Sequence, residues 1–400
     1  MIEREMAAEL RERFDRYPFV IVTGPRQSGK TTLCRSVFEQ PGCGYVSLDA
    51  LDRRAHAQAD PRGFLASLGT PAIIDEVQHV PDLFSYLKEL ADLDGRNGQY
   101  VLTGSENLKL SDKVRESLAG RASQLRLLPL SLAEVRSAGA TTSFGDIAYS
   151  GFYPRIVAER LEPREVLTDY FEMYVERDVG RMGGVGDLSA FRQFVALCAG
   201  RVGTLLDLTS LSDDVGVARS TIRKWLTVLE RSYIAFLLPP YFANIRKRLV
   251  KSPKLYFYDV GLASYLLGIE HPRQLVTHPL RGPLFENIVI AEALKHCYNR
   301  GREPRLSFFR DSRGLECDLL YGRGHGINAI EAKSGATVAS EWITRMGRVA
   351  ATVPAITEQT IAYGGDKAMT WRDVGIVPLD ELADALAGFD TGAHPRAPKP

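Results

Sequence analysis

The chain has 400 residues, of which 45% are hydrophobic and 25% are charged, and its net charge is +1. This length exceeds what one hydrophobic core usually supports, so two or three domains are expected, and the composition excludes a wholly disordered chain. The balanced charge excludes a uniformly acidic or basic protein, although one local basic surface stays compatible with it.

The N-terminal segment predicts an amphipathic helix, because Ile2, Met6, Leu10 and Phe14 are spaced four residues apart. It does not have the apolar core of a signal peptide, and no later run approaches the roughly 18 apolar residues of a membrane span. The five cysteines are scattered and contain no Cys-x-x-Cys pair, which argues against a zinc or redox site. We therefore expect a soluble, cytoplasmic protein without membrane association.

Residues 19–32 contain the strongest pattern, an apolar segment that runs into a glycine-bounded loop and then a predicted helix. Gly24 to Thr31 follow the P-loop spacing G-x-x-x-x-G-K-T, in which the glycines let backbone N–H groups face phosphate oxygens. Lys30 is expected to reach the β- and γ-phosphates of ATP, and Thr31 to ligate Mg²⁺. The predicted nucleotide-binding residues of this loop are Gly24, Pro25, Arg26, Gln27, Ser28, Gly29, Lys30, Thr31 and Thr32.

A second motif follows at Ala72–Glu76, an apolar run that ends in two carboxylates. Asp75 is expected to hold Mg²⁺, and Glu76 to orient and polarise the water that attacks the γ-phosphate. The next predicted strand, residues 99–105, ends in polar side chains, and ligands of parallel sheets bind at the carboxyl ends of the strands. The sequence does not decide which of these side chains meets the γ-phosphate or the water: Thr103, Ser105 or Asn107.

One arginine, Arg121, lies in a predicted loop before the strand at residues 125–130. A single arginine is usually a solvated or ion-paired surface residue. In a P-loop ATPase, however, it is a candidate arginine finger that acts on the nucleotide of a neighbouring subunit. The predicted catalytic residues are thus Lys30, Glu76 and Arg121, and this role for Arg121 requires a homo-oligomer.

These motifs resemble those of predicted prokaryotic AAA+-superfamily ATPases that carry an uncharacterised C-terminal domain. The chain shares with that family the segments Gly24–Thr32, Asp75-Glu-Val-Gln78, Leu102-Thr-Gly-Ser105 and Leu118-Ala-Gly-Arg121. Gly151-Phe-Tyr-Pro-Arg155 and Tyr174-Val-Glu-Arg-Asp178 resemble the family's linker, so the likeness covers nearly the whole chain. It implies an AAA+-like α/β domain with a parallel sheet over residues 1–135 and a linker over 136–186.

Residues 187–278 predict helices followed by a small hairpin, a winged-helix segment with a helix-turn-helix that turns at Gly216. Between Val215 and Lys251 the chain has eight basic residues and one acidic residue. This segment predicts DNA binding, although winged helices also serve as rigid spacers or protein contacts. The candidate DNA-binding residues are Arg219, Arg223 and Lys224 on the second helix, and Arg246, Lys247 and Arg248 at the wing tip.

Residues 279–388 predict a helix, three strands and a further helix, which resembles the PD-(D/E)XK nuclease fold. Side chains alternate along strands, so that Asp318, Glu331 and Lys333 can meet on one side of the sheet. The resemblance implies that Glu286, Asp318 and Glu331 hold a divalent metal and that Lys333 positions the attacking water or stabilises the developing charge on the phosphate. Cys317 stands where the motif has proline. The remaining residues, 389–400, are expected to be disordered.

The sequence thus predicts an ATPase, with ATP and Mg²⁺ as cofactors, that acts on or responds to DNA. Two alternatives stay open. One is a nucleotide-dependent switch that binds protein partners and whose C-terminal fold is a silent scaffold. The other is a metal-dependent nuclease that cleaves only when ATP permits it, an ATP-licensed nuclease.

Overall fold

The computed structural model describes residues 2–38, 42–105, 120–179, 185–241, 252–324 and 326–391. The chain divides into two compact units, and each is described by itself. The first unit comprises residues 1–130 together with the short segments 231–233 and 297–303, and the remaining residues form the second. None of the described helices is both long enough and apolar enough to cross a membrane.

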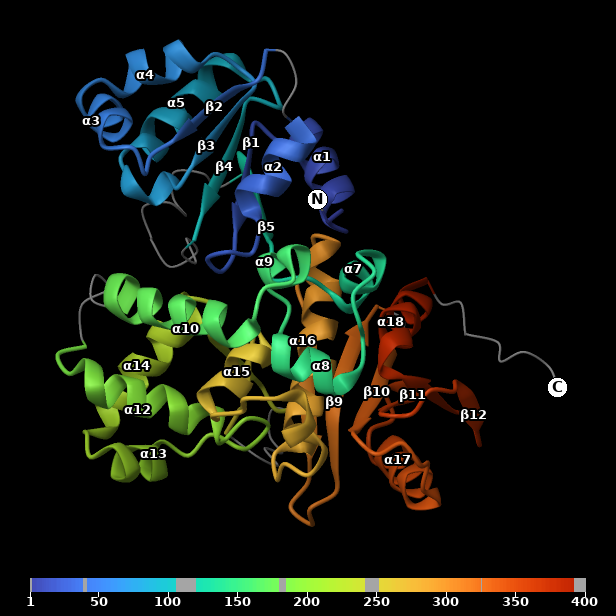
Figure 1. The fold of residues 1–400 in the computed structure, drawn as a ribbon. Helices are drawn as coiled ribbons and strands as arrows, with labels where there is room; N and C mark the ends of the chain where they lie inside the picture. The colour runs from blue at the N-terminus through green and yellow to red at the C-terminus, as the bar shows by residue number, and fades with distance from the viewer. Residues whose placement is uncertain are drawn as a thin grey trace. The chain divides into compact units, whose positions relative to one another are not determined.

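The first unit is built on a five-stranded sheet with the order β2-β3-β4-β1-β5, in which every pair of neighbours is parallel (Figure 1). Its strands are β1 (Phe19–Thr23), β2 (Gly44–Ser47), β3 (Ala72–Asp75), β4 (Tyr100–Gly104) and β5 (Ala122–Arg126). The inner strands β1, β3 and β4 are buried along their whole length, as expected when both faces of a parallel sheet are covered. This sheet confirms the predicted α/β domain of the P-loop NTPase type.

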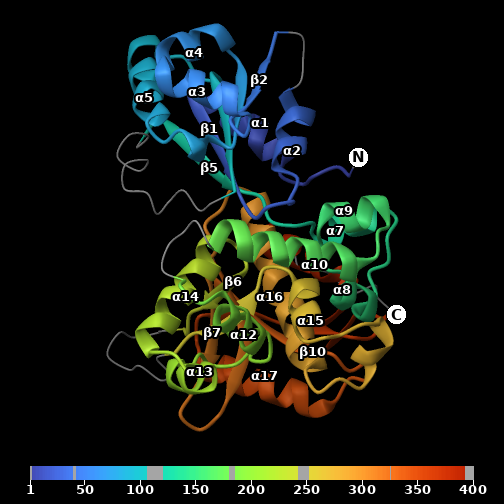
Figure 2. The same ribbon diagram turned by 60° about the vertical axis from the view of Figure 1, so that its left-hand side comes forward.

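Helices cover both faces of this sheet. They are α1 (Ala7–Arg16), α2 (Lys30–Phe38), α3 (Leu51–Ala59), α4 (Pro61–Leu68), η1 (Val77–His79) and α5 (Leu83–Asp94). Figures 1 and 2 show α1 and α2 on one side of the sheet and α3, α4 and α5 on the other. On the latter side, Phe64 of α4 and Leu87 of α5 share one apolar core with Ile74 and Leu102 of the strands.

The second unit begins with helices and a small antiparallel sheet. These elements are α7 (Leu132–Ser137), α8 (Phe144–Ser150), α9 (Pro154–Glu159), α10 (Pro163–Met173), η3 (Tyr174–Val179), α12 (Leu188–Ala199), α13 (Leu208–Val215), α14 (Arg219–Arg231), β6 (Ala235–Leu238), β7 (Lys254–Phe257), α15 (Val260–Leu266) and η4 (Pro272–Val276). Gly216 ends α13 with φ +77°, a conformation that favours glycine. Ala235 pairs with Phe257, so the predicted helix, turn, helix and hairpin follow in the expected order.

A six-stranded mixed sheet with the order β12-β13-β11-β10-β9-β8 completes the second unit. Its elements are α16 (Arg281–Asn299), β8 (Leu306–Arg310), β9 (Glu316–Arg323), β10 (Gly326–Lys333), α17 (Ser340–Thr352), β11 (Ile356–Tyr363), β12 (Met369–Trp371), β13 (Val374–Pro378), η5 (Leu379–Glu381) and α18 (Leu382–Thr391). The helix, three strands and helix from α16 to α17 follow in the predicted order. Ile343 and Met346 of α17 pack on Ala329 and Ile361 of the sheet.

The predicted domain bounds stay a prediction. In the structure, the predicted linker, winged-helix and nuclease-like segments lie in one compact unit, in which Asn287 of α16 holds both backbone polar groups of Phe257 at 2.8 and 2.9 Å. Residues 389–391, which the prediction assigns to the tail, continue α18. Its Asp390 is held there, because the hydroxyl of Tyr321 donates to this carboxylate at 2.7 Å.

Candidate nucleotide-binding site

The loop between β1 and α2 wraps tightly at the carboxyl end of β1. Gly29 has φ +86° and Gln27 has φ +59°, both in the region of positive φ. A Cβ atom on Gly24 would lie 2.0 Å from the carbonyl oxygen of Leu127, so that only glycine fits there. The tight backbone of this loop is therefore built by the residues that the sequence pattern identified.

Arg4, which the sequence analysis missed, braces this loop from outside. Its guanidinium donates to the carbonyl oxygen of Ser28 at 2.6 Å and to that of Leu128 at 2.8 Å, and the side chain is buried. The hydroxyl of Ser28 is also buried, and it has no hydrogen-bond partner in the described part of the chain. No signal in the sequence marks Arg4, because an arginine beside an amphipathic helix usually lies in solvent.

The ammonium group of Lys30 is folded onto its own loop. Its Nζ donates to the carbonyl oxygens of Gly24 at 3.1 Å and Pro25 at 2.7 Å. Burial lowers the pKa of Lys30 to about 8, although the carboxylates of Glu76 and Asp75 partly offset this effect. The lysine is therefore held beside the loop as a buried cation.

Asp75 is the centre of a hydrogen-bond network at the ends of β3 and β4. The hydroxyl of Thr31 donates to its Oδ2 at 2.9 Å, the hydroxyl of Thr103 donates to its Oδ1, and that of Tyr45 lies 3.3 Å from Oδ2. The structure thus brings Thr31 and Asp75 together, as predicted from residues 44 positions apart. Tyr45 is a further member that the sequence analysis missed.

Glu76 follows Asp75 in a left-handed conformation, with φ +55° and ψ +45°. Its Oε2 accepts hydrogen bonds from the amide of Gln78 and, at 3.4 Å, from the hydroxyl of Ser105. Its backbone N–H donates to the Thr103 hydroxyl at 3.3 Å. Of the three candidate polar residues at the end of β4 and beyond it, Thr103 therefore contacts Asp75, Ser105 contacts Glu76, and Asn107 lies outside the described residues.

Arg121 lies at the opposite edge of the sheet. Its carbonyl oxygen accepts from the N–H of Phe19 at the start of β1, whereas the loop follows the end of that strand, roughly 16 Å further on. Its Nε donates to Asp92 of α5 at 2.5 Å. Arg121 therefore does not reach the loop of its own chain, and a role on a neighbouring subunit stays a prediction.

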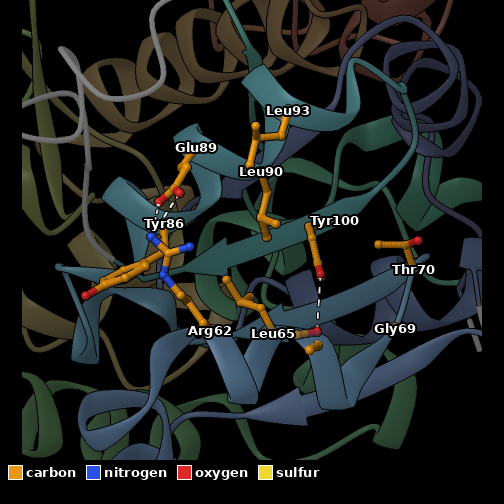
Figure 3. Close-up of a pocket in the computed structure, with 10 residues that line it drawn as sticks. Arg62, Leu65, Gly69, Thr70, Tyr86, Glu89, Leu90, Leu93 and Tyr100 are labelled. Carbon is orange, nitrogen blue, oxygen red and sulfur yellow. Dashed lines mark hydrogen bonds and ion pairs between the residues drawn. The ribbon is translucent and has the colours of Figure 1, made fainter.

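A pocket of about 270 Å³ lies at this same edge and is separate from the loop (Figure 3). Leu65 of α4, Leu90 of α5 and Tyr100 of β4 line it. Across its mouth, the guanidinium of Arg62 forms an ion pair of 2.8 Å with Glu89. Because Tyr100 begins its strand, the pocket is distant from Asp75, which ends the neighbouring one.

The predicted basic face of α14 is formed in the second unit. Arg219, Arg223 and Lys224 are exposed, whereas Ile222 and Trp225 of the same helix are buried. The other three candidates, Arg246, Lys247 and Arg248, lie outside the described residues. DNA binding by this face stays a prediction.

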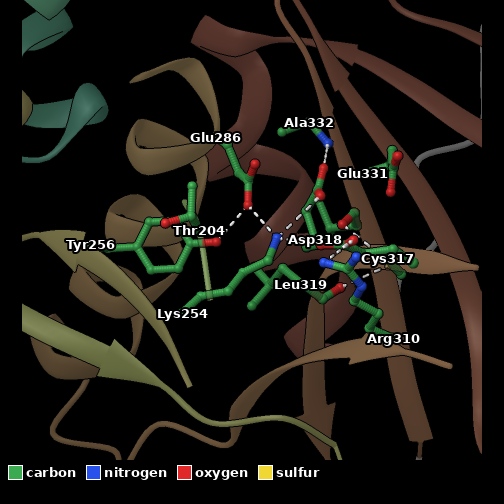
Figure 4. A network of polar contacts seen from close by, with 12 residues as sticks. Thr204, Lys254, Tyr256, Glu286, Arg310, Cys317, Asp318, Leu319, Glu331 and Ala332 are labelled. Carbon is green, nitrogen blue, oxygen red and sulfur yellow. Dashed lines mark hydrogen bonds and ion pairs between the residues drawn. The ribbon is translucent and has the colours of Figure 1, made fainter. Parts of the chain in front are cut away.

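The carboxylates of the nuclease-like segment surround a lysine that the sequence analysis did not include (Figure 4). Nζ of Lys254 lies 2.9 Å from Oε1 of Glu286, 2.6 Å from Oε1 of Glu316 and 3.9 Å from Oδ1 of Asp318. The hydroxyl of Tyr256 also donates to Glu286. We call these five residues the Lys254 cluster.

The other two predicted residues pair with each other beside this cluster: Nζ of Lys333 lies 2.7 Å from Oε1 of Glu331, and burial and the charge of Asp318 raise the pKa of Glu331. In the part of the chain that the structure describes, no three His, Cys, Asp or Glu residues are grouped as metal ligands. Burial and the charge of Asp318 raise the pKa of Glu286. Burial alone would lower the pKa of Lys254, but the surrounding carboxylates, Glu286 first, outweigh it and raise that pKa. The arrangement therefore differs from the predicted one, in which three carboxylates share a metal ion.

Three family models cover most of the chain. Residues 16–136 match the AAA domain, residues 141–273 match a domain of unknown function, DUF8612, and residues 281–382 match another, DUF4143. Among solved structures, a Walker-type ATPase of Pyrococcus abyssi is similar, with a TM-score of 0.46 and 13% identity over 66% of this chain and 96% of that one. AMPPCP-bound DnaA of Aquifex aeolicus has a TM-score of 0.31 and 14% identity, over 56% of this chain and 86% of its own.

Full-length relatives also match. A protein of Haemophilus influenzae is 24% identical over 329 residues, which are 75% of this chain and 80% of that protein. Rv2008c of Mycobacterium tuberculosis and Mb2031c of Mycobacterium bovis are each 32% identical over 385 residues, which span 95% of this chain and 84% of theirs. The chain therefore belongs to the same family as these two mycobacterial proteins, and its residues 16–136 form an AAA-type ATPase domain.

Proposed function

We propose that this protein binds ATP with Mg²⁺ at the loop of residues 24–31 and hydrolyses the ATP. The observation that carries the proposal is the hydrogen bond of 2.9 Å between Thr31 and Asp75, beside the buried ammonium of Lys30. The residues fit such a ligand, because the buried Ser28 hydroxyl and the Lys30 ammonium provide donors for phosphate oxygens. Thr31 and Asp75 supply the hard oxygen ligands that Mg²⁺ prefers.

Each residue then has one task. Lys30 binds the β- and γ-phosphates, and Thr31 and Asp75 hold the cation, which spreads the negative charge of the phosphates. Glu76 accepts a proton from the attacking water. Gln78 and Ser105 position its carboxylate, since both hydrogen-bond to the same oxygen of Glu76. Thr103 fixes Asp75 and the backbone of Glu76 together.

ATP binding is expected to take up a proton above pH 8. The pKa of Lys30 is lowered to about 8, so the free protein loses this charge as the pH rises further, whereas bound phosphate favours the charged form. The association constant for ATP should therefore fall by up to about tenfold per pH unit above pH 8, and stay nearly constant from pH 7 to 8. Calorimetric titration at pH 9, in two buffers of different ionisation enthalpy, measures the proton uptake.

Two variants complete this experiment. Lys30→Ala should not bind ATP at either pH, whereas Lys88→Ala, which removes a lysine of α5, should bind like the wild type. Equal affinity at pH 7 and pH 9 without proton uptake would contradict the assignment of Lys30 to the phosphates.

DNA binding is the second candidate function, and the exposed basic face of α14 favours it. We infer that α13 and α14 act as a helix-turn-helix and that β6 and β7 are the wing, because the elements follow in that order. Arg219 and Arg223 are one helical turn apart, so both side chains can meet one phosphate backbone. The two other hypotheses, a protein-binding switch and an ATP-licensed nuclease, predict different results in the next experiment and in the metal titrations below.

DNA affinity is expected to depend steeply on salt. If about five basic residues meet phosphates, the logarithm of the association constant should fall with log salt at a slope of about −4.5. Replacing Arg219, Arg223 and Lys224 together with alanine should weaken binding to all duplex sequences and reduce the slope by about 2.7. Fluorescence anisotropy with a labelled duplex at several salt concentrations measures both effects. The control is Arg348→Ala, which removes an exposed arginine of α17 and should bind DNA like the wild type. Unchanged DNA binding by the triple variant would favour the protein-binding switch.

A further inference from the structure

The Lys254 cluster lies where the nuclease resemblance implies a divalent metal, although its residues do not fit one. We propose that the ammonium group of Lys254 is the permanent cation of this centre, so that the carboxylates of Glu286, Glu316 and Asp318 bind Lys254 in place of Mg²⁺ or Mn²⁺. The nuclease-like segment is then a metal-independent scaffold joined to β7 by this lysine. The inference goes beyond the proposed ATPase function and does not rest on it.

The distances place the nitrogen at the centre of the carboxylates. Nζ of Lys254 is within 3 Å of two carboxylate oxygens, one on α16 and one on β9, and 3.9 Å from Asp318. Figure 4 shows Glu286 and Asp318 on two sides of this nitrogen, where a metal ion would otherwise have to lie. A divalent ion would have to share these oxygens with a like charge, which is unfavourable at such distances.

The cluster is enclosed and already nearly balanced in charge. The Lys254 side chain is 4% exposed, and those of its three carboxylate partners are 13 to 17% exposed. Arg310 adds a second cation, with Nη1 3.6 Å from Oε2 of Glu316. The other oxygen of Asp318 accepts the backbone N–H of Ala332 at 2.9 Å. These partners leave the carboxylates with little need for a further cation.

Lys254 is also fixed in place by its backbone. Its strand β7 pairs with β6 on one side, where Lys254 lies opposite Leu238, and Leu205 bridges to it on the other. Leu206 N–H donates to the carbonyl of Pro253 at 2.8 Å, and Asn287, next to Glu286, clamps the end of the same strand. These contacts hold the backbone of Lys254 in place, so that its side chain starts from a fixed position beside Glu286 and Glu316.

Mn²⁺ titration of the full chain tests the proposal, with electron paramagnetic resonance counting the free ion. All titrations use the Asp75→Ala background, which removes the carboxylate proposed to hold the cation of the nucleotide site. With Lys254 present, Glu286→Gln and Asp318→Asn should not change Mn²⁺ binding. Lys254→Met has no charge and a side chain only one atom shorter. It should gain one Mn²⁺, with an association constant at least about tenfold higher than that of the same background with Lys254. Lys254→Arg should gain none.

The outcomes separate the hypotheses. Addition of Asp318→Asn to Lys254→Met should abolish the gained binding. Mn²⁺ binding in the presence of Lys254 that Glu286→Gln or Asp318→Asn removes would overturn the proposal and support a metal-dependent nuclease. A folded Lys254→Met protein that binds no additional Mn²⁺ would also overturn it. If Lys254→Met does not fold, the two carboxylate variants decide the question in the presence of Lys254.

Discussion

Replacing Glu76 with glutamine should lower the rate of ATP hydrolysis by at least about 10²-fold while ATP still binds. An amide has nearly the same size as the carboxylate and can keep the contact with Ser105, but it does not accept a proton from the attacking water. Glu76 has a left-handed backbone and its side chain contacts Ser105, whereas Thr31 hydrogen-bonds to Asp75. Loss of turnover without loss of affinity would show that Glu76 acts on the attacking water and not on the binding of the phosphates.

Phosphate release under saturating ATP gives the turnover, and calorimetric titration gives the affinity. Gln78→Ala should show an intermediate loss of turnover, because Gln78 only positions the carboxylate of Glu76. Glu89→Gln, which changes a carboxylate at the opposite edge of the sheet, is the matched control and should keep full activity. Hydrolysis by Glu76→Gln at the wild-type rate would remove Glu76 from the mechanism.

The geometry of the candidate nucleotide site could be predicted because its residues are close together in the sequence or follow successive strands. Gly24 to Thr31 are contiguous, and a parallel sheet brings the end of each strand to one edge, so that Asp75 had to lie near Thr31. Spacing alone carries that inference. By contrast, Arg4 reaches the loop only through packing of the N-terminal segment, and no local pattern marks it.

The nuclease-like centre shows where prediction from sequence fails. Asp318 and Glu331 lie on neighbouring strands because β9 pairs with β10, but strand alternation does not reveal which side chain from elsewhere balances their charge. Lys254 comes from a hairpin more than 60 residues earlier, and its pattern there indicated only a strand. Glu316 was missed for a related reason, since it became significant only when Lys254 was found beside it.

Replacing Arg121 with alanine is expected to lower the ATPase rate of the assembled protein by about 10³-fold, the contribution of an arginine finger supplied by a neighbouring subunit. Arg121 cannot act on the nucleotide of its own chain, since it immediately precedes β5, beside the start of β1, and the loop follows the far end of β1. An ion pair with Asp92 holds the guanidinium at that edge, and its side chain is 30% exposed. The position thus suits a contact with another subunit.

Mixing two inactive variants provides the decisive measurement. Lys30→Ala subunits lack the phosphate-binding lysine but keep Arg121, whereas Arg121→Ala subunits keep the lysine. If the finger acts between subunits, random assembly at equal concentrations should restore about one quarter of the interfaces, and hence a comparable part of the rate.

Arg121→Lys should restore little, because a single ammonium does not replace the planar fork of arginine. Asp92→Asn, which keeps Arg121 and removes only its ion pair, should remain active. The specific activity of the wild type should also rise with protein concentration, since each site is complete only in the oligomer. A monomer whose specific activity does not change with concentration would contradict the finger assignment. Arg121 would then be only a surface ion-pair partner of Asp92.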